Sequence, residues 1–234
     1  SGNLATAIPL PTIGATLVHN SQFHGASLPV GSGAVGLGNG WELSFRSSLQ
    51  FTDANQNRLT LHLGDGSKAT YSRSSPDGLW LSDDPRLSQQ KFVQGEDSTL
   101  ISQGDGIKTT YSRGASGIYI VARIEDVNGN YTTVDRTSAD AEIWSTSAGE
   151  STTIRVNGGG QNITITDPAG GVYTLTYVGT QLVSIVSPDQ SSWGLQYAGD
   201  GFLIGRVTTP TGLHTRFSYF ADGSLREMAD HLNY

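Results

Sequence analysis

The chain has 234 residues, of which 15% are charged, and it contains 30 glycines, one methionine and no cysteine. Its net charge of −7, with no Lys/Arg cluster, argues against a nucleic-acid-binding surface. The lack of cysteine excludes disulfides, thiolate metal sites and a cysteine nucleophile, and no apolar run is long enough to predict a membrane span.

Apolar residues alternate with period two along most of the chain, and no window shows the spacing of an amphipathic helix. We therefore predict an essentially all-β fold of repeated antiparallel hairpins. The predicted divisions are a lead-in segment (1–35), a β region opened by a Gly-Trp strand (36–150) and a C-terminal set of hairpin repeats (151–234).

The lead-in contains "GSGAVG" at residues 31–36, which matches the G-x-G-x-x-G pattern of dinucleotide-binding sites. Such a site needs a strand before the glycines and a helix after them. Here Pro29 precedes the glycines, and a Gly-rich turn and a β-pattern strand follow. The pattern therefore predicts a loop, and we expect no cofactor.

The next stretch, "WELSFRSSLQF" (41–51), predicts a strand with Trp41 on its apolar face. "DANQN" (53–57) and "DVNGN" (126–130) imitate the start of a calcium loop but lack the Gly and Glu that an EF-hand requires. Asp and Asn favour turns because their side chains bond to their own backbone. Turns are thus the preferred interpretation, with a weak calcium site of another geometry left open.

A near-identical phrase occurs twice, as "GDGSKATYSR" (64–73) and "GDGIKTTYSR" (104–113). Repetition of this kind indicates one supersecondary unit used again, with neighbouring copies sharing a core. We predict that Gly66 and Gly106 lie in the hairpin turns that open each copy.

Between the two copies lies "DGLWLSDDP" (77–85), a segment of turn residues around Trp80. Trp41 and Trp193 alternate in phase with apolar neighbours and are predicted to be core residues. Trp80 has no such context, so we expect it to be the most exposed tryptophan and a candidate glycan contact.

The C-terminal region repeats with a longer period. Three segments begin with Pro and end with Tyr nine positions later, at Tyr177, Tyr197 and Tyr219. The second and third are followed by Asp-Gly turns, Asp200–Gly201 and Asp222–Gly223. Each segment predicts one strand-turn-strand element that must stack on its neighbours, because a lone hairpin is marginally stable.

No pattern of catalytic or metal-binding residues emerges from the sequence. There is no G-x-S-x-G motif, and the histidines lack metal-ligand spacing: His19, His24, His62, His214 and His231. We predict no catalytic, cofactor-binding or metal residues and no enzymatic activity. A hydrolase site assembled from distant carboxylates is the least favoured alternative.

The spaced Y-x-x-D-G-x-L motifs, the Gly-Trp strand in "GLGNGWELS" (36–44) and the D-x-N-G-N turns together resemble the Rhs/YD-repeat family. That family includes bacterial polymorphic toxins, shell components of insecticidal toxin complexes, and teneurins. Gln56 departs from the family's Gly in the first D-x-N-G-N turn. The resemblance covers residues 36–73 and 104–230 most specifically, and the family's C-terminal self-cleavage motif has no match.

The resemblance implies a continuous coiled β-sheet ribbon that is part of a hollow shell, with a C-terminal toxin or other cargo inside it. The expected partners are the rest of a longer polypeptide and its cargo, with secretion machinery or glycans as further candidates. It also implies a secreted or cell-surface location reached by bacterial effector delivery. The alternative is an extracellular carbohydrate-binding or adhesion module. Open sheet edges predict self-association in either case.

Overall fold

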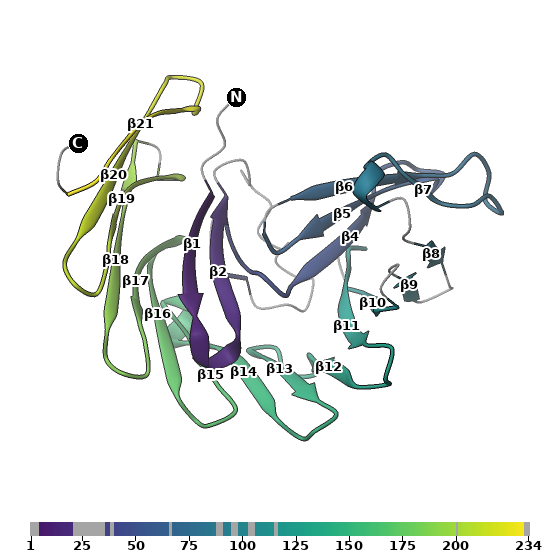
Figure 1. The fold of residues 1–234 in the computed structure, drawn as a ribbon, viewed down its shortest axis with the longest axis horizontal. Helices are drawn as coiled ribbons and strands as arrows, with labels where there is room; N and C mark the ends of the chain where they lie inside the picture. The colour runs from purple at the N-terminus through teal and green to yellow at the C-terminus, as the bar shows by residue number, and fades with distance from the viewer. Residues whose placement is uncertain are drawn as a thin grey trace. The chain divides into compact units, whose positions relative to one another are not determined.

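The computed structural model describes residues 5–20, 36–37, 40–65, 67–87, 91–94, 98–102, 106–114, 117–199 and 201–231. The all-β prediction is confirmed: across these residues the only helical elements are three short 3₁₀ turns, and the remainder is strands and turns (Figure 1). Within the same described ranges, no helix is long and apolar enough to span a membrane.

The chain forms two compact units, which we describe separately. The terminal unit contains residues up to 20, 36–44 and 152–231, and the middle unit contains residues 45–151. The division after residue 151 lies next to the predicted boundary at 150/151. Residues 36–44, however, group with the C-terminal strands rather than with the β region predicted to start at residue 36.

The physical reason is a turn inside the apolar run 41–51, which interrupts the single strand predicted there. Ser44 and Phe45 lie in this turn, and the run is divided into two strands that pair in different sheets. The first strand pairs with β2, through Leu17 opposite Leu43, and the second pairs with β5, through Leu49 opposite Leu61.

In the terminal unit, a three-stranded antiparallel sheet is followed by a run of strands that each pair with the next along the chain. The first sheet has the order β1-β2-β3. Its elements are β1 (Ala5–Leu10), η1 (Pro11–Ile13), β2 (Ala15–Asn20) and β3 (Trp41–Leu43). The later elements are β14 (Ser151–Asn157), η3 (Gly158–Gly160), β15 (Asn162–Thr166), β16 (Val172–Val178), β17 (Gln181–Val186), β18 (Ser192–Ala198), β19 (Leu203–Thr208), β20 (His214–Tyr219) and β21 (Leu225–Ala229).

The middle unit contains two runs of antiparallel pairs, β4 to β7 and β8 to β13, and β4 also pairs with β11. Its elements are β4 (Ser47–Phe51), β5 (Arg58–Leu63), β6 (Lys68–Ser72), β7 (Leu81–Ser82), η2 (Pro85–Leu87), β8 (Lys91–Gln94), β9 (Ser98–Ser102), β10 (Lys108–Arg113), β11 (Tyr119–Glu125), β12 (Tyr131–Asp135) and β13 (Ala141–Thr146).

One turn geometry joins hairpins in both units. In residues 126–130, the Asp126 N–H donates to the Asn130 carbonyl and the Gly129 N–H donates to the Asp126 carbonyl. Gly129 has a φ of 84°, in the left-handed region that glycine adopts without a Cβ penalty. The same pair of bonds closes residues 167–171, 187–191, 209–213 and 220–224.

Candidate functional site

The three repeat tyrosines occupy equivalent positions in successive hairpins. Tyr177 pairs with Leu182, Tyr197 with Ile204 and Tyr219 with Leu225, and a β-bulge lies immediately before each tyrosine. Paired residues share one side of a sheet, and the pairs between hairpins, Ile185 with Trp193 and Val207 with Thr215, keep the same phase. These six side chains therefore lie on one face. We call the face of β16–β21 that carries them the tyrosine face.

The tyrosine hydroxyls link each hairpin to the one before it. The Tyr197 hydroxyl donates to the carbonyl of Leu182 at 3.1 Å, and Leu182 is the residue opposite Tyr177. The Tyr219 hydroxyl donates to the carbonyl of Ile204 at 2.7 Å, and Ile204 is the residue opposite Tyr197. The bond therefore recurs at the same structural position in two successive repeats.

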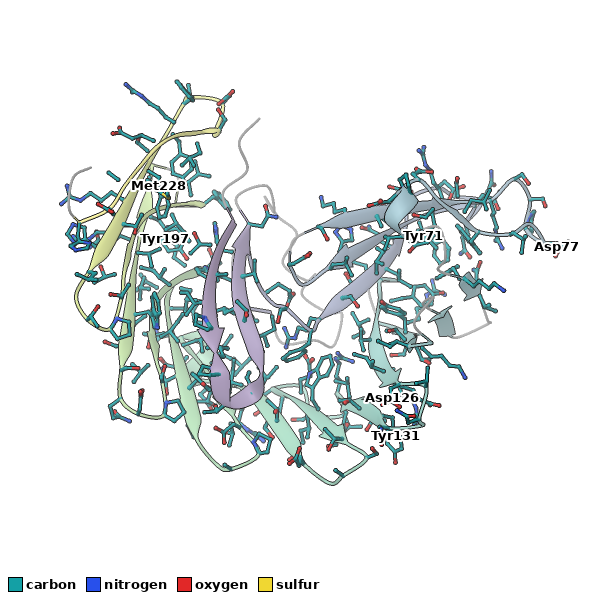
Figure 2. The ribbon with its side chains drawn as sticks, in the orientation of Figure 1. Tyr71, Asp77, Asp126, Tyr131, Tyr197 and Met228 are labelled. Atoms are coloured by element: carbon teal, nitrogen blue, oxygen red, sulfur yellow. The ribbon has the colours of Figure 1, made fainter. Side chains whose placement is uncertain are left out.

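The first tyrosine of the series bonds to the N-terminal part of the terminal unit instead. The Tyr177 hydroxyl donates to the carbonyl of Leu37 at 2.9 Å, and Leu37 is buried. The Trp41 indole Nε1 donates to the Tyr197 hydroxyl at 2.9 Å. The early strands thus pack on the tyrosine face, and Figure 2 labels Tyr197 within this sheet.

A third link joins the turn between β1 and β2 to β16. The Thr12 and Tyr173 hydroxyls form a hydrogen bond, with their oxygens 2.9 Å apart. Thr12 also hydrogen-bonds the buried Asp167, and this bond, together with those from the N–H groups of Gly171 and Ala169, lowers the pKa of the Asp167 carboxyl. Figure 1 shows the β1–β2 hairpin in front of β16, consistent with these bonds.

Burial of the repeat tyrosines changes their acidity. Desolvation raises the pKa of Tyr197, partly offset by its hydrogen bonds with Trp41 and Leu182. Desolvation also raises the pKa of Tyr219, to about 12. Both hydroxyls therefore keep their proton, and with it the bond to the preceding hairpin, well above neutral pH.

The predicted turn glycines have the backbone conformations that such turns need. Gly106, Gly201 and Gly223 have φ values of 83°, 83° and 78°. Asp222 accepts bonds from the Ser224 hydroxyl and N–H, which lowers the pKa of its carboxyl. Gly66 and Asp200 lie outside the described residues, as do residues 31–35 of the lead-in glycine pattern.

The doubled phrase of the middle unit forms strands β6 and β10, which carry Tyr71 and Tyr111. A bulge precedes Tyr111, as it precedes the repeat tyrosines of the terminal unit. The Tyr111 hydroxyl lies 2.9 Å from the Ser47 Oγ, and burial raises its pKa. The pKa of Tyr71 (labelled in Figure 2) is raised to about 12, mainly by burial.

The expected exposure of Trp80 is wrong. Its side chain is only 7% exposed and packs against Phe92 and Phe51, with ring centroids 5.0 and 6.0 Å away. The Arg73 guanidinium lies 4.7 Å from its ring centroid. The flanking Leu79 and Leu81 are 84% and 66% exposed, so backbone alternation turns Trp80 inward despite its polar sequence context. Trp80 is therefore no longer a candidate glycan contact.

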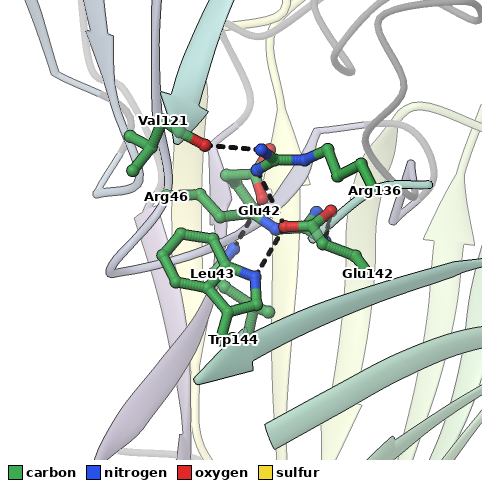
Figure 3. A network of polar contacts seen from close by, with 7 residues as sticks. All are labelled: Glu42, Leu43, Arg46, Val121, Arg136, Glu142 and Trp144. Carbon is green, nitrogen blue, oxygen red and sulfur yellow. Dashed lines mark hydrogen bonds and ion pairs between the residues drawn. The ribbon is translucent and has the colours of Figure 1, made fainter. Parts of the chain in front are cut away.

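The middle unit contains a buried ionic cluster that no pattern in the sequence predicted (Figure 3). Glu142 on β13 is fully buried and accepts bonds from Arg46 at 2.9 Å and from Arg136 at 3.1 Å. The Trp144 indole also donates to Glu142, at 2.6 Å. Arg46 and Glu142 are 96 residues apart, so no local pattern could have paired them.

The D-x-N-G-N segments are turns that use their own polar groups. Asp126 accepts bonds from the N–H groups of Asn128 and Asn130 and from the Asn130 side chain. These bonds, led by that from the Asn130 side chain, lower the pKa of Asp126. Among the described residues, no group of three or more His, Asp or Glu side chains could hold a metal ion.

Comparisons with known proteins give no assignment. No model of a known protein family matches the chain, and no curated protein matches it. Among solved structures, a porin-like protein from Bacteroides uniformis aligns with 9% identity and a TM-score of 0.36, over 80% of this chain and 97% of its own. The TCP10 domain of Danio rerio CPAP, in complex with a STIL peptide, aligns with 14% identity and a TM-score of 0.19, over 97% of this chain and 99% of its own. Similarity at this level establishes neither fold nor function.

Proposed function

We propose that the chain is a non-enzymatic wall segment of an Rhs/YD-repeat β-shell, which encloses or presents a C-terminal toxin cargo. The observation that supports this function best is the recurring tyrosine bond. Tyr197 and Tyr219 each tie their hairpin to the backbone of the preceding one, at equivalent positions 15 residues back. A repeated link of this kind favours a wall that grows by adding hairpins.

Containment would follow from the way the hairpins pair. From β15 to β21 each strand hydrogen-bonds to the next, so the backbone donors and acceptors between neighbours are used within the sheet. A sheet built in this way resists penetration by a protease or an unfolded chain. The proposed location, secreted or at the cell surface, belongs to the same hypothesis.

The carbohydrate-binding alternative loses the one glycan contact that the sequence favoured. It predicted exposed aromatic platforms, and Trp80 was the favoured one. Trp41, Trp80 and Trp144 are 1%, 7% and 5% exposed, and each packs or hydrogen-bonds within its own unit. Other aromatic side chains are exposed, Phe220 at 56% and Tyr131 at 37%, and a glycan-binding screen would test this alternative.

Protease protection of the complete polypeptide would test the proposal. A C-terminal cargo inside an intact wall should survive digestion that destroys it in isolation. Leu182→Ala removes a fully buried side chain of the tyrosine face and should open the wall, so that the cargo is digested. Val178→Ala, at a position 66% exposed, is the control and should preserve protection. Equal digestion of the cargo in all three proteins would refute the proposal.

A further inference from the structure

The tyrosine face continues onto the last hairpin, where it is less well covered. On this face Leu175 pairs with Ile185, Leu195 with Val207 and Phe217 with Met228, one pair in each successive hairpin. The second member of each pair becomes more exposed along the chain: Ile185 is 0%, Val207 7% and Met228 63% exposed. The same structural position thus changes from buried to exposed along the series.

The cover over the earlier hairpins is this chain's own polypeptide. Trp41 is 1% exposed and donates its indole N–H to the hydroxyl of Tyr197. Tyr197 meanwhile donates its own proton to the carbonyl of Leu182. Its hydroxyl therefore acts in two directions, binding the preceding hairpin as a donor and a tryptophan of the covering segment as an acceptor.

Tyr219 repeats only the first of these two bonds. Its hydroxyl donates to the Ile204 carbonyl, while in the part of the chain that the structure describes its oxygen accepts no hydrogen bond comparable to that from Trp41. Leu225 and Phe217, which neighbour Tyr219 on the face, are both partly exposed. Figure 2 marks Met228 on this last hairpin and Tyr197 on the hairpin before it.

We propose that the tyrosine face at Phe217, Tyr219, Leu225 and Met228 is a docking site for a polypeptide segment carrying a tryptophan. Its indole N–H would donate to the Tyr219 oxygen, as the Trp41 indole donates to Tyr197 at the preceding repeat, and its ring would cover Met228. The occupant is inferred from continuity with the surface that residues 36–44 cover at Tyr177 and Tyr197. As part of the proposed shell, this segment would belong to the cargo, so the assignment of the occupant rests on the proposed function.

Met228 makes a direct test possible because it is the only methionine in the chain. Protein labelled at the methionine methyl group should give one NMR signal from this site. The probe is acetyl-Gly-Trp-Glu-Leu-Ser-amide, which has the sequence of residues 40–44, and the control peptide has Ala in place of Trp. We expect the tryptophan peptide to shift the Met228 signal to saturation, and the control peptide to leave it nearly unchanged.

Tyr219→Phe should weaken binding of the tryptophan peptide about fivefold, as expected for one lost hydrogen bond. Tyr131→Phe, at an exposed tyrosine of the middle unit, should leave binding unchanged. No saturable shift, or equal shifts with both peptides, would overturn the docking site. A Met228 signal that shifts with protein concentration and then no longer responds to the tryptophan peptide would also overturn it, since the occupant would then be a second copy of the chain. None of these outcomes bears on whether a shell exists, which imaging and protease protection test separately.

Discussion

In the C-terminal hairpins of the terminal unit, one hydrogen bond recurs from repeat to repeat, whereas the middle unit is held by contacts that occur once each. The hydroxyls of Tyr197 and Tyr219 make equivalent bonds to the backbone of the strand that precedes their own. The middle unit instead has an aromatic cluster around Trp80 and a buried Arg46–Glu142–Arg136 cluster.

The difference shows that one turn type can join strands that are held either by repeated side-chain bonds or by single long-range contacts. Residues 126–130 and 220–224 close with the same pair of backbone bonds, although they lie in different units. Where side-chain positions stay in phase, stability is added repeat by repeat. Where the phase is lost, long-range contacts must hold the strands together, and each of them becomes individually important.

The largest effect is expected from breaking the ionic cluster of the middle unit. Glu142→Gln removes the buried carboxylate that Arg46 and Arg136 share, and should lower the free energy of unfolding by about 3–5 kcal/mol. Glu125→Gln breaks an ion pair whose members are 31–38% exposed and should cost no more than about 1 kcal/mol. Denaturant titration would measure both, and a similar loss for the two variants would contradict the contrast.

A turn substitution should have the next largest effect. Gly201→Val forces a β-branched residue to a φ of 83° and drives its Cβ into the Gln181 amide, which bonds the Gly201 carbonyl. We expect a loss of about 2–3 kcal/mol, from backbone strain and the displaced bond. Gly223→Val has similar strain but no atom within 4 Å of the new Cβ, so it should cost less. Thermal unfolding would rank the two, and an unchanged melting temperature for Gly201→Val would disprove the turn assignment.

The repeated tyrosine bond predicts a graded response within one region. Tyr197→Phe removes bonds to both Trp41 and Leu182 and should cost about 2 kcal/mol. Tyr219→Phe removes only the bond to Ile204 and should cost about 1 kcal/mol. Chemical unfolding followed by circular dichroism would separate them. Equal losses would mean that the Trp41 contact adds nothing.

Alkaline pH provides an independent probe of the same tyrosines. Tyr219 and Tyr71 have pKa values of about 12 in the folded protein, compared with about 10 for a tyrosine in an unfolded chain. Each of them therefore loses its proton more readily when the chain is unfolded. Their contribution to stability is therefore complete below pH 10 and is lost as the pH rises from about 10 to 12. Tyr219→Phe should reduce this dependence, as measured by unfolding at a series of pH values. If the free energy of unfolding fell more steeply with pH in the variant than in the parent, the proposed contribution of Tyr219 would be refuted.

The smallest effect concerns a non-glycine residue at the left-handed turn position. Gln190 has a φ of 68° at the position that Gly212 occupies in the next such turn, with a φ of 83°. Gln190→Gly should stabilise the protein by up to about 1 kcal/mol, because relief of strain exceeds the added entropy of the unfolded chain. Gly212→Gln should have the opposite effect. Changes of the same sign in calorimetry would contradict the equivalence of the two turns.

The sequence supports prediction of features that depend on local pattern. Alternation predicted the all-β class, because a strand's side-chain period is two. Tyr197 and Tyr219 were singled out because they recur in phase with Asp-Gly turns. Their bond to the preceding hairpin could not be predicted, since it depends on how far the bulged strand brings the hydroxyl toward the neighbouring backbone.

Features set by distant parts of the chain escaped sequence reasoning. Trp80 was expected to be exposed because its neighbours are turn residues, yet it is buried by Phe92 and Phe51. Arg46 and Glu142 were not recognised as partners because nothing near either residue indicates burial of a charge. Likewise, the grouping of residues 36–44 with the C-terminal strands depends on strand pairing that sequence spacing does not encode.

The central claim, that this chain is part of a shell wall, is tested most directly on the complete polypeptide by electron-microscope imaging with intact-mass analysis of the same sample. The shell account predicts a hollow particle with density inside it and a cleaved C-terminal fragment that stays with the particle. A filled or open β-structure made of one uncleaved chain would contradict it.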